Sequence, residues 1–269
     1  MKNSTQNTAK MTALVTGASS GIGYELAKIL ARNGYNLVLV ARSQKQLAEL
    51  ATELENNYNI SVYVLVKDLS KDGAAQEIFD ELSKASIHVD VLVNNAGFTN
   101  YGFFTETNLQ SELNMMHVNM ISLMHLTKLF LPRMIERGEG KIMNVASIAA
   151  FLPGPLMANY YATKAYVLHF SEALLNELQG SGVTVTALCP GPTQSGFQER
   201  GGLGDIRLME GKIPTSESVA KVGYRGMMNG KAIVIPGLGN KLLAFSIRFS
   251  PRGIVGKIVR YLQESRATA

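Results

Sequence analysis

The sequence has little of what marks secreted or membrane-spanning proteins. Its 269 residues include one cysteine, Cys189, so no disulfide can form within the chain, which favours a reducing, cytoplasmic location. No apolar run approaches the ~20 residues of a membrane-spanning helix, and residues 1–10 lack the apolar core of a secretory signal. The chain also lacks internal repeats and low-complexity linkers. We therefore expect one globular body, and we expect no metal site.

Charged residues are scarce, at 17%, and they are unevenly placed. From residue 237 onward there are six basic residues and one acidic residue, which accounts for the whole net charge of +5. The first 236 residues are therefore neutral, and we expect no nucleic-acid binding by them. Positions 254, 255, 258, 259 and 262 form one apolar helical stripe. Residues 237–269 are interpreted as a basic amphipathic extension that packs on the body or on a partner subunit, with peripheral membrane contact as the alternative.

Strand and helix patterns alternate from residue 11 to about 235. Short apolar runs predict strands over 12–15, 36–41, 62–66, 90–93, 141–146, 183–188 and 232–235. Helical patterns follow the glycine-rich turn at 17–23 and cover 43–57, 71–85, 106–136, 158–179 and 216–228. This alternation predicts an α/β fold with a doubly wound parallel sheet, formed by a single domain over residues 1–236.

A glycine-rich turn joins the first strand to a helix with Leu26, Ile29 and Leu30 on one face. Its spacing is G-x-x-x-G-x-G, and a strand, glycine turn and helix in this order present backbone N–H groups to a phosphate. A purely structural turn is the alternative. The phosphate interpretation assigns the loop residues to cofactor binding: Gly17, Ser19, Ser20, Gly21, Ile22 and Gly23.

Polar or glycine motifs follow the other strands, where ligands bind in doubly wound sheets. Arg42 ends the second strand, at a place where an acidic residue would favour NAD, so its guanidinium predicts NADP(H). A solvated arginine is the simpler alternative. Asp68 is a candidate for the adenine amino group or for a turn cap. The remaining motifs are the segment 94–97, Ser147 and the pair Pro190 and Gly191.

Tyr160 and Lys164 stand four residues apart on a predicted helix and so share a face. A phenol has a pKa of about 10, and a nearby ammonium lowers that pKa toward working pH. Tyr161 is also within helical reach of Lys164, so spacing alone leaves both tyrosines open. Ser147 could bind the same substrate oxygen or cap a turn. Asn119 lies inside a predicted helix, where asparagine is unfavourable, which indicates a hydrogen-bonding or packing role.

Together these residues resemble the short-chain dehydrogenase/reductase family over about residues 11–236. The resemblance implies a seven-stranded Rossmann-like sheet, and it selects Tyr160 over Tyr161. It also implies a catalytic set that exchanges a proton and a hydride with substrate: Asn119, Ser147, Tyr160 and Lys164. The cofactor residues that it implies beyond the glycine loop are Arg42, Asp68, Leu69, Asn95, Ala96, Gly97, Tyr160, Lys164, Pro190, Gly191 and Thr193. One NADP feature of the family is missing, because Ser20 replaces a basic residue before the middle glycine.

The resulting prediction is an NADP(H)-dependent oxidoreductase that interconverts a ketone or aldehyde and an alcohol, with Tyr160 as general acid and base. The alternative is an NADPH-binding regulatory protein with little turnover. Apolar loop residues either form a pocket for a hydrophobic substrate or pack on the core: Phe98, Phe103, Phe104, Phe151, Leu152 and Met157. The glycine-rich segment 194–212 is interpreted as a lid, with an ordinary flexible connection as the alternative. The family resemblance suggests a homodimer or homotetramer.

Overall fold

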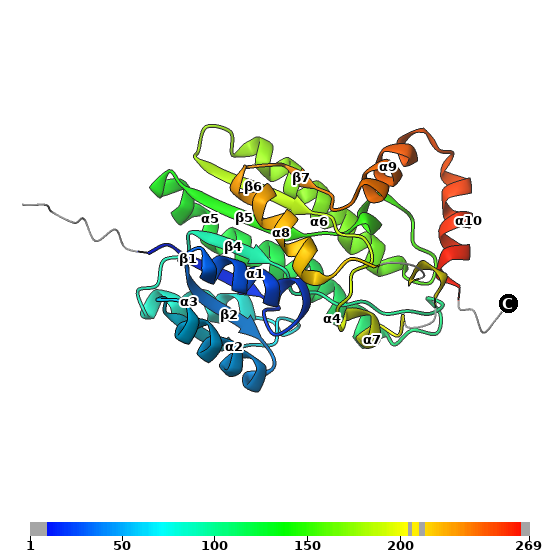
Figure 1. The fold of residues 1–269 in the computed structure, drawn as a ribbon. Coiled ribbons are helices and arrows are strands. Elements are labelled where there is room, and N and C mark those ends of the chain that lie inside the picture. The colour runs from blue at the N-terminus through cyan, green and yellow to red at the C-terminus, as the bar shows by residue number, and fades with distance from the viewer. Residues whose placement is uncertain (1–9, 204–205, 210–212, 265–269) are drawn as a thin grey trace, which may run out of the picture.

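The computed structural model describes residues 10–203, 206–209 and 213–264. In these residues seven strands form one parallel sheet in the order β3-β2-β1-β4-β5-β6-β7 (Figure 1). The strands are β1 (Thr12–Thr16), β2 (Asn36–Ala41), β3 (Val62–Val66), β4 (Val91–Asn94), β5 (Gly140–Val145), β6 (Val183–Leu188) and β7 (Ile233–Val234). The predicted doubly wound, Rossmann-like fold is therefore confirmed.

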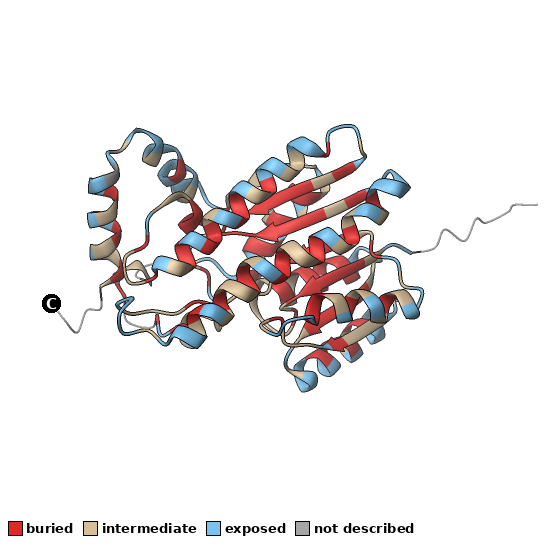
Figure 2. Ribbon diagram, turned by 180° about the vertical axis from the view of Figure 1, so that it is seen from behind, coloured by how far each residue is buried: buried red, intermediate tan, exposed pale blue. Residues whose placement is uncertain are grey.

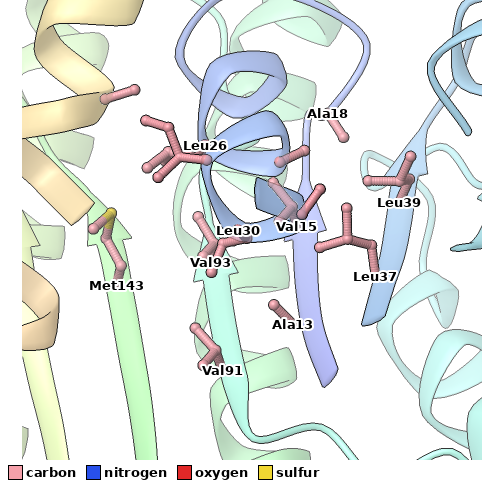
Figure 3. Close-up of a cluster of buried hydrophobic side chains, with 14 of the residues drawn as sticks. Ala13, Val15, Ala18, Leu26, Leu30, Leu37, Leu39, Val91, Val93 and Met143 are labelled. Carbon is pink, nitrogen blue, oxygen red and sulfur yellow. The ribbon is translucent and has the colours of Figure 1, made fainter. Parts of the chain in front are cut away.

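Helices cover both faces of the sheet because alternate strand residues point to opposite faces. Ala13 and Val15 of β1 pack toward α1 (Gly21–Arg32), and the same cluster contains residues of α2 (Gln44–Asn57) and α8 (Ser216–Met228) (Figure 3). Leu14 points to the other face, whose cluster includes α3 (Ala74–Lys84) and α5 (Leu123–Arg137). On this face the long helix α6 (Ala158–Glu177) also packs, through Leu174 and Leu175.

The order of the strands reverses between β1 and β4. Chain order runs outward from β1 through β2 to β3, then returns to β4 on the other side of β1. The connection that follows β1 runs toward one edge of the sheet, and the connection that follows β4 runs toward the other. A crevice therefore opens at the carboxyl ends of these two strands. Each motif that the sequence places after a strand is thereby carried to this one edge of the sheet.

The single helix predicted over 106–136 is wrong in detail. Asn108 caps helix α4 (Leu109–Met116), because its side chain accepts a hydrogen bond from the backbone N–H of Ser111 at 2.9 Å. A π-helical segment, His117–Ser122, then separates α4 from α5. Helix α5 continues through Pro132 to Arg137 and is capped by Gly138, whose φ of 72° suits glycine.

The tail contains more helix than the single apolar stripe predicted. Helix α9 (Leu238–Ser246) follows β7, a short 3₁₀ turn covers Ile247–Phe249, and α10 (Arg252–Gln263) follows Pro251. Both helices lie together at the end of the molecule toward which the strands point (Figure 1). Figure 2 shows that they are largely exposed apart from one side of α10. Within the described ranges, no helix has the length and hydropathy needed to cross a bilayer.

Candidate active site

One cavity of about 750 Å³ opens at the carboxyl edge of the sheet. Most of the predicted cofactor residues line it: Gly17, Ser19, Ser20, Gly21, Ile22, Arg42, Asp68, Leu69, Asn95, Ala96, Gly97, Pro190, Gly191 and Thr193. Ser147, Tyr160 and Lys164 line the same cavity. Gly23 and Asn119 do not line it, so any contribution they make to the site passes through neighbouring residues.

The glycine turn is shaped for close approach of an anion. Gly17 and Gly21 have φ values of 66° and 61°, which favour glycine. A Cβ on Gly23 would lie 2.5 Å from the carbonyl oxygen of Gly17, so glycine lets α1 pack against the turn. The side chain of Ser20 accepts no capping hydrogen bond from the first turn of α1. The N–H groups of that turn are thus left to serve a ligand at the helix N-terminus, as a pyrophosphate requires.

Thr16 and Asn95 hold the carboxyl ends of β1 and β4 together. The Thr16 hydroxyl accepts hydrogen bonds from the backbone N–H groups of Asn95 and Ala96, both at 3.0 Å. The Asn95 side chain in turn donates to the carbonyl oxygens of Thr16 at 2.9 Å and Gly17 at 3.2 Å. Asn94, by contrast, is buried in the sheet, where it donates to Asn144 and Thr127. The segment after β4 therefore fixes the floor of the cavity at the point where the strand order reverses.

Cations surround the end of the cavity nearest β2 and β3. Arg42, Lys67 and Lys71 line this end together with Asp68. Burial raises the pKa of Asp68, but hydrogen bonds from Ser70 and the charges of Arg42 and Lys71 outweigh burial and leave the pKa below its usual value. Asp68 is thus held as a carboxylate among basic groups. Lys67 and Lys71 were not among the predicted cofactor residues. The sequence placed Lys71 at the start of a helix over 71–85, whereas α3 begins at Ala74 and leaves Lys71 in the preceding turn, where it lines the cavity.

Tyr160 and Ser147 both line the cavity, and their hydroxyl groups interact. Tyr160 lies on α6 and is 8% exposed, and burial raises its pKa to about 12, while hydrogen bonding with Ser147 lowers it. Ser147 follows β5, and its hydroxyl also accepts a hydrogen bond from the backbone N–H of Ala149 at 3.1 Å. A substrate oxygen placed between the two hydroxyls would meet a proton donor on each side.

Lys164 does not lower the pKa of Tyr160 as the sequence predicted. Its ammonium nitrogen lies 5.8 Å from the centre of the Tyr160 ring and donates to the carbonyl oxygen of Val145 at 2.8 Å. Burial lowers the pKa of Lys164 itself to about 8. The prediction is wrong for the protein alone because burial disfavours both charged forms, the phenolate and the ammonium.

Asn119 lies in the π-helical segment, and π-bulges are frequent at functional sites. Its side chain donates to the carbonyl oxygen of Phe98 and to the hydroxyl of Thr163, both at 3.1 Å. Its oxygen accepts from the backbone N–H of Phe98 at 3.2 Å. Thr163 is the neighbour of Lys164 in sequence, so Asn119 links the loop after β4 to the helix that carries Tyr160 and Lys164.

The Tyr161 hydroxyl contacts α10, whereas the Tyr160 hydroxyl contacts Ser147. The Tyr161 hydroxyl accepts a hydrogen bond from the side-chain nitrogen of Gln263 at 2.5 Å, and the Tyr161 ring meets the Tyr160 ring edge to face at 6.0 Å. Gln263 ends α10, so the tail reaches the wall of the cavity. No sequence pattern connects residues 161 and 263, and this contact was not predicted.

The other end of the cavity is apolar. Its lining residues there are Phe98, Met157, Phe197, Leu203, Ile206 and Leu208. Phe98 and Met157 were predicted, but Phe103 and Phe104 are 50% and 67% exposed and do not line the cavity. Phe151 and Leu152 pack into neighbouring clusters. Phe103 and Phe104 fit neither expectation, because the loop turns outward after Tyr101 and leaves both rings exposed.

The segment 194–212, interpreted as a lid, contributes much of this apolar end. It contains α7 (Phe197–Arg200) and the 3₁₀ turn Arg207–Met209, and Gln194 forms a parallel bridge with Thr215. The Phe197 ring lies 5.7 Å from the Tyr160 ring. Gly204 and Gly211 of this segment lie outside the described residues. The segment therefore covers Tyr160, and its movement stays a prediction.

Comparison with known proteins agrees with this geometry. A family model described as short chain dehydrogenase matches residues 11–202. The very-long-chain 3-oxoacyl-CoA reductase-B of Danio rerio is 34% identical over 229 residues, which cover 81% of this chain and 70% of that enzyme. Against several other vertebrate reductases of that name, the chain spans 58% of their length.

Solved structures with the same fold carry both nicotinamide cofactors. A short-chain dehydrogenase from Sphingobium yanoikuyae in complex with NADPH has a TM-score of 0.81 and 30% identity, covering 96% of this chain and 99% of that one. A short chain dehydrogenase/reductase from Burkholderia phymatum in complex with NAD has a TM-score of 0.78 and 25% identity, covering 89% and 92%. From the matched family model, the shared fold and the site residues gathered in one cavity, the chain belongs to the short-chain dehydrogenase/reductase family of oxidoreductases.

Proposed function

We propose that the protein is an NADP(H)-dependent oxidoreductase that interconverts a hydrophobic ketone or aldehyde and the corresponding alcohol. The observation that carries the proposal is the position of Ser147, Tyr160 and Lys164. These three residues line a single cavity that has a glycine turn and basic side chains at one end and apolar side chains at the other. A dinucleotide fits the first end, because the glycine turn, the N-terminus of α1 and Arg42 match its pyrophosphate and a 2′-phosphate.

The chemistry follows from the protonation states of the side chains. Bound NADPH would supply a hydride to the carbonyl carbon. Tyr160, with a pKa of about 12, carries its proton at neutral pH and donates it to the carbonyl oxygen as the alcohol forms. Ser147 donates a hydrogen bond to the same oxygen and polarises the carbonyl group. Lys164 would hold the ribose of the bound cofactor, and in that complex its positive charge would stabilise the phenolate that proton transfer leaves on Tyr160.

Substrate class is inferred from the apolar end of the cavity. Met157, Phe197 and Leu208 there would contact an alkyl chain. Relatives of this chain include reductases of very-long-chain 3-oxoacyl-CoA, so a 3-oxoacyl thioester is the first substrate to test. We expect NADPH consumption with long-chain 3-oxoacyl thioesters or bulky ketones, and slower turnover of short polar ketones. Tight NADPH binding without turnover of any carbonyl compound in the panel would favour the regulatory alternative.

Arg42 is proposed to set the preference for NADP(H). Arg42→Asp removes the guanidinium that would meet a 2′-phosphate, and we expect about 10- to 100-fold weaker NADPH binding, the effect of one charge-assisted hydrogen bond. NADH binding should change little or improve. Isothermal titration with both cofactors measures the two affinities. Lys45→Asp is the matched control, because Lys45 is exposed on α2 and does not line the cavity. Equal losses for NADH and NADPH in Arg42→Asp would contradict the assignment.

Three further assignments remain proposals of the same kind. The segment 194–212 closes over bound substrate, the protein forms a homodimer or homotetramer, and it works in the cytoplasm or on a membrane that faces it. Protease protection of 194–212 by cofactor plus substrate is the expected sign of closure. Light scattering gives the mass of the oligomer in solution.

A further inference from the structure

The tail exposes an unusual amount of apolar surface. On α9 and the turn after it, Leu238, Leu242, Phe245 and Phe249 are between 61% and 76% exposed. Their spacing of four, three and four residues places them on one helical face. Ile254, Ile258 and Tyr261 of α10 follow the same spacing and are between 54% and 59% exposed. We name these seven residues, with Phe103 and Phe104 of the neighbouring loop, the tail surface.

Packing within the chain does not explain the tail surface, because α10 already buries a different face. Val255 and Val259 are 7% and 6% exposed and pack in the cluster that contains Met157, Tyr160 and Tyr161. Gln263, on the same side, is fully buried against Tyr161, and its carbonyl oxygen accepts a hydrogen bond from Tyr101 at 2.6 Å. The exposed stripe of α10 therefore remains outside after the helix has docked on the apolar end of the cavity.

Basic side chains border the tail surface. Lys241, Arg248 and Lys257 are exposed on the two helices and the turn between them. The guanidinium of Arg260 lies 4.8 Å from the centre of the Phe103 ring, which joins the loop aromatics to α10. The one acidic residue between 237 and 264 is Glu264, and it pairs with Arg260 at 2.9 Å and with Arg207 at 3.8 Å. Exposed aromatic and aliphatic side chains bordered by lysine and arginine are the composition of a helix that lies on an anionic bilayer.

We propose that the tail surface binds the protein to an anionic membrane, with α9 and α10 lying in the interface. The charge distribution favours lipid over a second copy of the chain. A two-fold contact through this surface would bring its basic residues toward those of the partner, where like charges repel. In a bilayer that contains anionic lipid, the apolar side chains of the tail surface can enter the hydrocarbon region, and the basic side chains beside them can contact the negatively charged headgroups.

This placement has a consequence for substrate access. The buried side of α10 contacts the residues that form the apolar end of the cavity, so binding through the tail surface would hold that end beside the lipid. A hydrophobic substrate dissolved in the membrane would then have a short path to Tyr160. Membrane binding does not depend on the proposed reaction, so it can be measured without any turnover.

Vesicle flotation of the full chain tests the proposal. We expect binding to vesicles of phosphatidylcholine with phosphatidylglycerol, weak binding to phosphatidylcholine alone, and loss of binding as salt rises. The apolar variant Leu242→Ser/Phe245→Ser/Phe249→Ser should bind at least about tenfold more weakly, because three side chains no longer enter the bilayer. The charge variant Lys241→Gln/Lys257→Gln should bind about 30-fold more weakly, the effect of two basic residues near an anionic surface.

Matched controls lie elsewhere on the molecule. Ile135→Ser changes an exposed apolar residue near the amino end of β5, at the opposite end of the sheet, and Lys128→Gln/Lys231→Gln removes two exposed lysines outside the tail. Both should bind vesicles as the wild type does. Circular dichroism checks the fold of each variant, and if the apolar variant fails to fold, the charge variant decides.

Two results would overturn the proposal. One is wild-type binding that is absent, or equal on the two kinds of vesicle. The other is a tail surface that contacts a second copy of the chain. In that case the wild type would not bind vesicles, and light scattering would show a smaller mass for the apolar variant than for the wild type. The vesicle measurement is independent of turnover. If the protein binds anionic vesicles but reduces no carbonyl compound, the membrane proposal is supported and only the proposed reaction is contradicted.

Discussion

Tyr160→Phe is expected to lower kcat by about 10²- to 10⁴-fold, the range that a positioned general acid contributes. The variant removes one oxygen from a side chain whose ring is held by Phe197 and Tyr161, so packing around it should survive. NADPH affinity is expected to stay within a fewfold of the wild type. Stopped-flow turnover with the best carbonyl substrate and titration with NADPH measure the two quantities separately.

Two other tyrosines of α6 make the result specific. Tyr161→Phe should retain most of kcat, because the Tyr161 hydroxyl accepts a hydrogen bond from Gln263, whereas Ser147 interacts with Tyr160. Tyr166→Phe should behave as the wild type, since Tyr166 is 38% exposed and stacks on Phe170 away from the cavity. A larger loss in Tyr161→Phe than in Tyr160→Phe would move the catalytic role to the other tyrosine.

The high pKa of Tyr160 also predicts how rate depends on pH. Reduction needs the protonated phenol, which persists up to about pH 12 in the protein alone. Carbonyl reduction should therefore show no loss from Tyr160 ionisation between pH 6 and 9, whereas alcohol oxidation should rise with pH because it needs the phenolate. A fall in the reduction rate near pH 8 would report loss of the Lys164 charge, whereas a fall centred well below pH 8 would contradict the burial of the Tyr160 phenol.

The sequence predicted the sheet and the residues after each strand because both depend on local patterns. Apolar runs such as 36–41 and 183–188 are strands in the structure with the same bounds. Parallel strands bring their carboxyl ends to one edge, so Gly17, Asn95 and Ser147 had to meet once the topology was right. The family resemblance supplied the seven-stranded sheet and the choice of Tyr160, which spacing left open.

The features that escaped prediction depend on contacts between distant residues. The π-helical segment at Asn119 accompanies hydrogen bonds to Phe98 and Thr163, and neither partner is visible in the helical pattern of 106–136. The contact of Gln263 with Tyr161 spans 102 residues. The pKa of Tyr160 follows from burial, which depends on the segment around Phe197 and on the tail. These errors share one cause: sequence spacing shows which residues share a face, but it does not show what covers that face.

Lys164→Met is expected to abolish most turnover and yet make the protein without cofactor more stable. Burial lowers the pKa of Lys164 from 10.5 to about 8, so the charged lysine costs the folded state about 3 kcal/mol at pH 7. Methionine keeps the length of the side chain and removes the charge, but it loses the hydrogen bond from the ammonium to the carbonyl oxygen of Val145, worth about 1.5 to 3 kcal/mol. The net gain is at most about 1.5 kcal/mol, a rise in Tm of up to about 3 to 6 °C for a chain of this size.

The pH dependence of that gain identifies its cause. Below about pH 8 both folded and unfolded lysine are protonated, and the full penalty is present. Between about pH 8 and 10.5 the unfolded chain binds the proton that the folded chain has released, so wild-type stability rises with pH and approaches that of the variant. Tyr160 acts in the opposite sense above pH 10, but it does so in both proteins and cancels in the difference.

Urea unfolding of the wild type and Lys164→Met at pH 7 and pH 10 measures this difference, with Lys128→Met as a control for an exposed lysine on α5. The control should differ from the wild type by less than about 0.5 kcal/mol at both pH values. A variant that is less stable than the wild type at pH 7, or a gain that does not shrink by pH 10, would show that Lys164 is not a buried charge. If the gain is found together with a loss of kcat of at least about 100-fold, the protein retains this lysine for its role at the site and at the expense of its own stability.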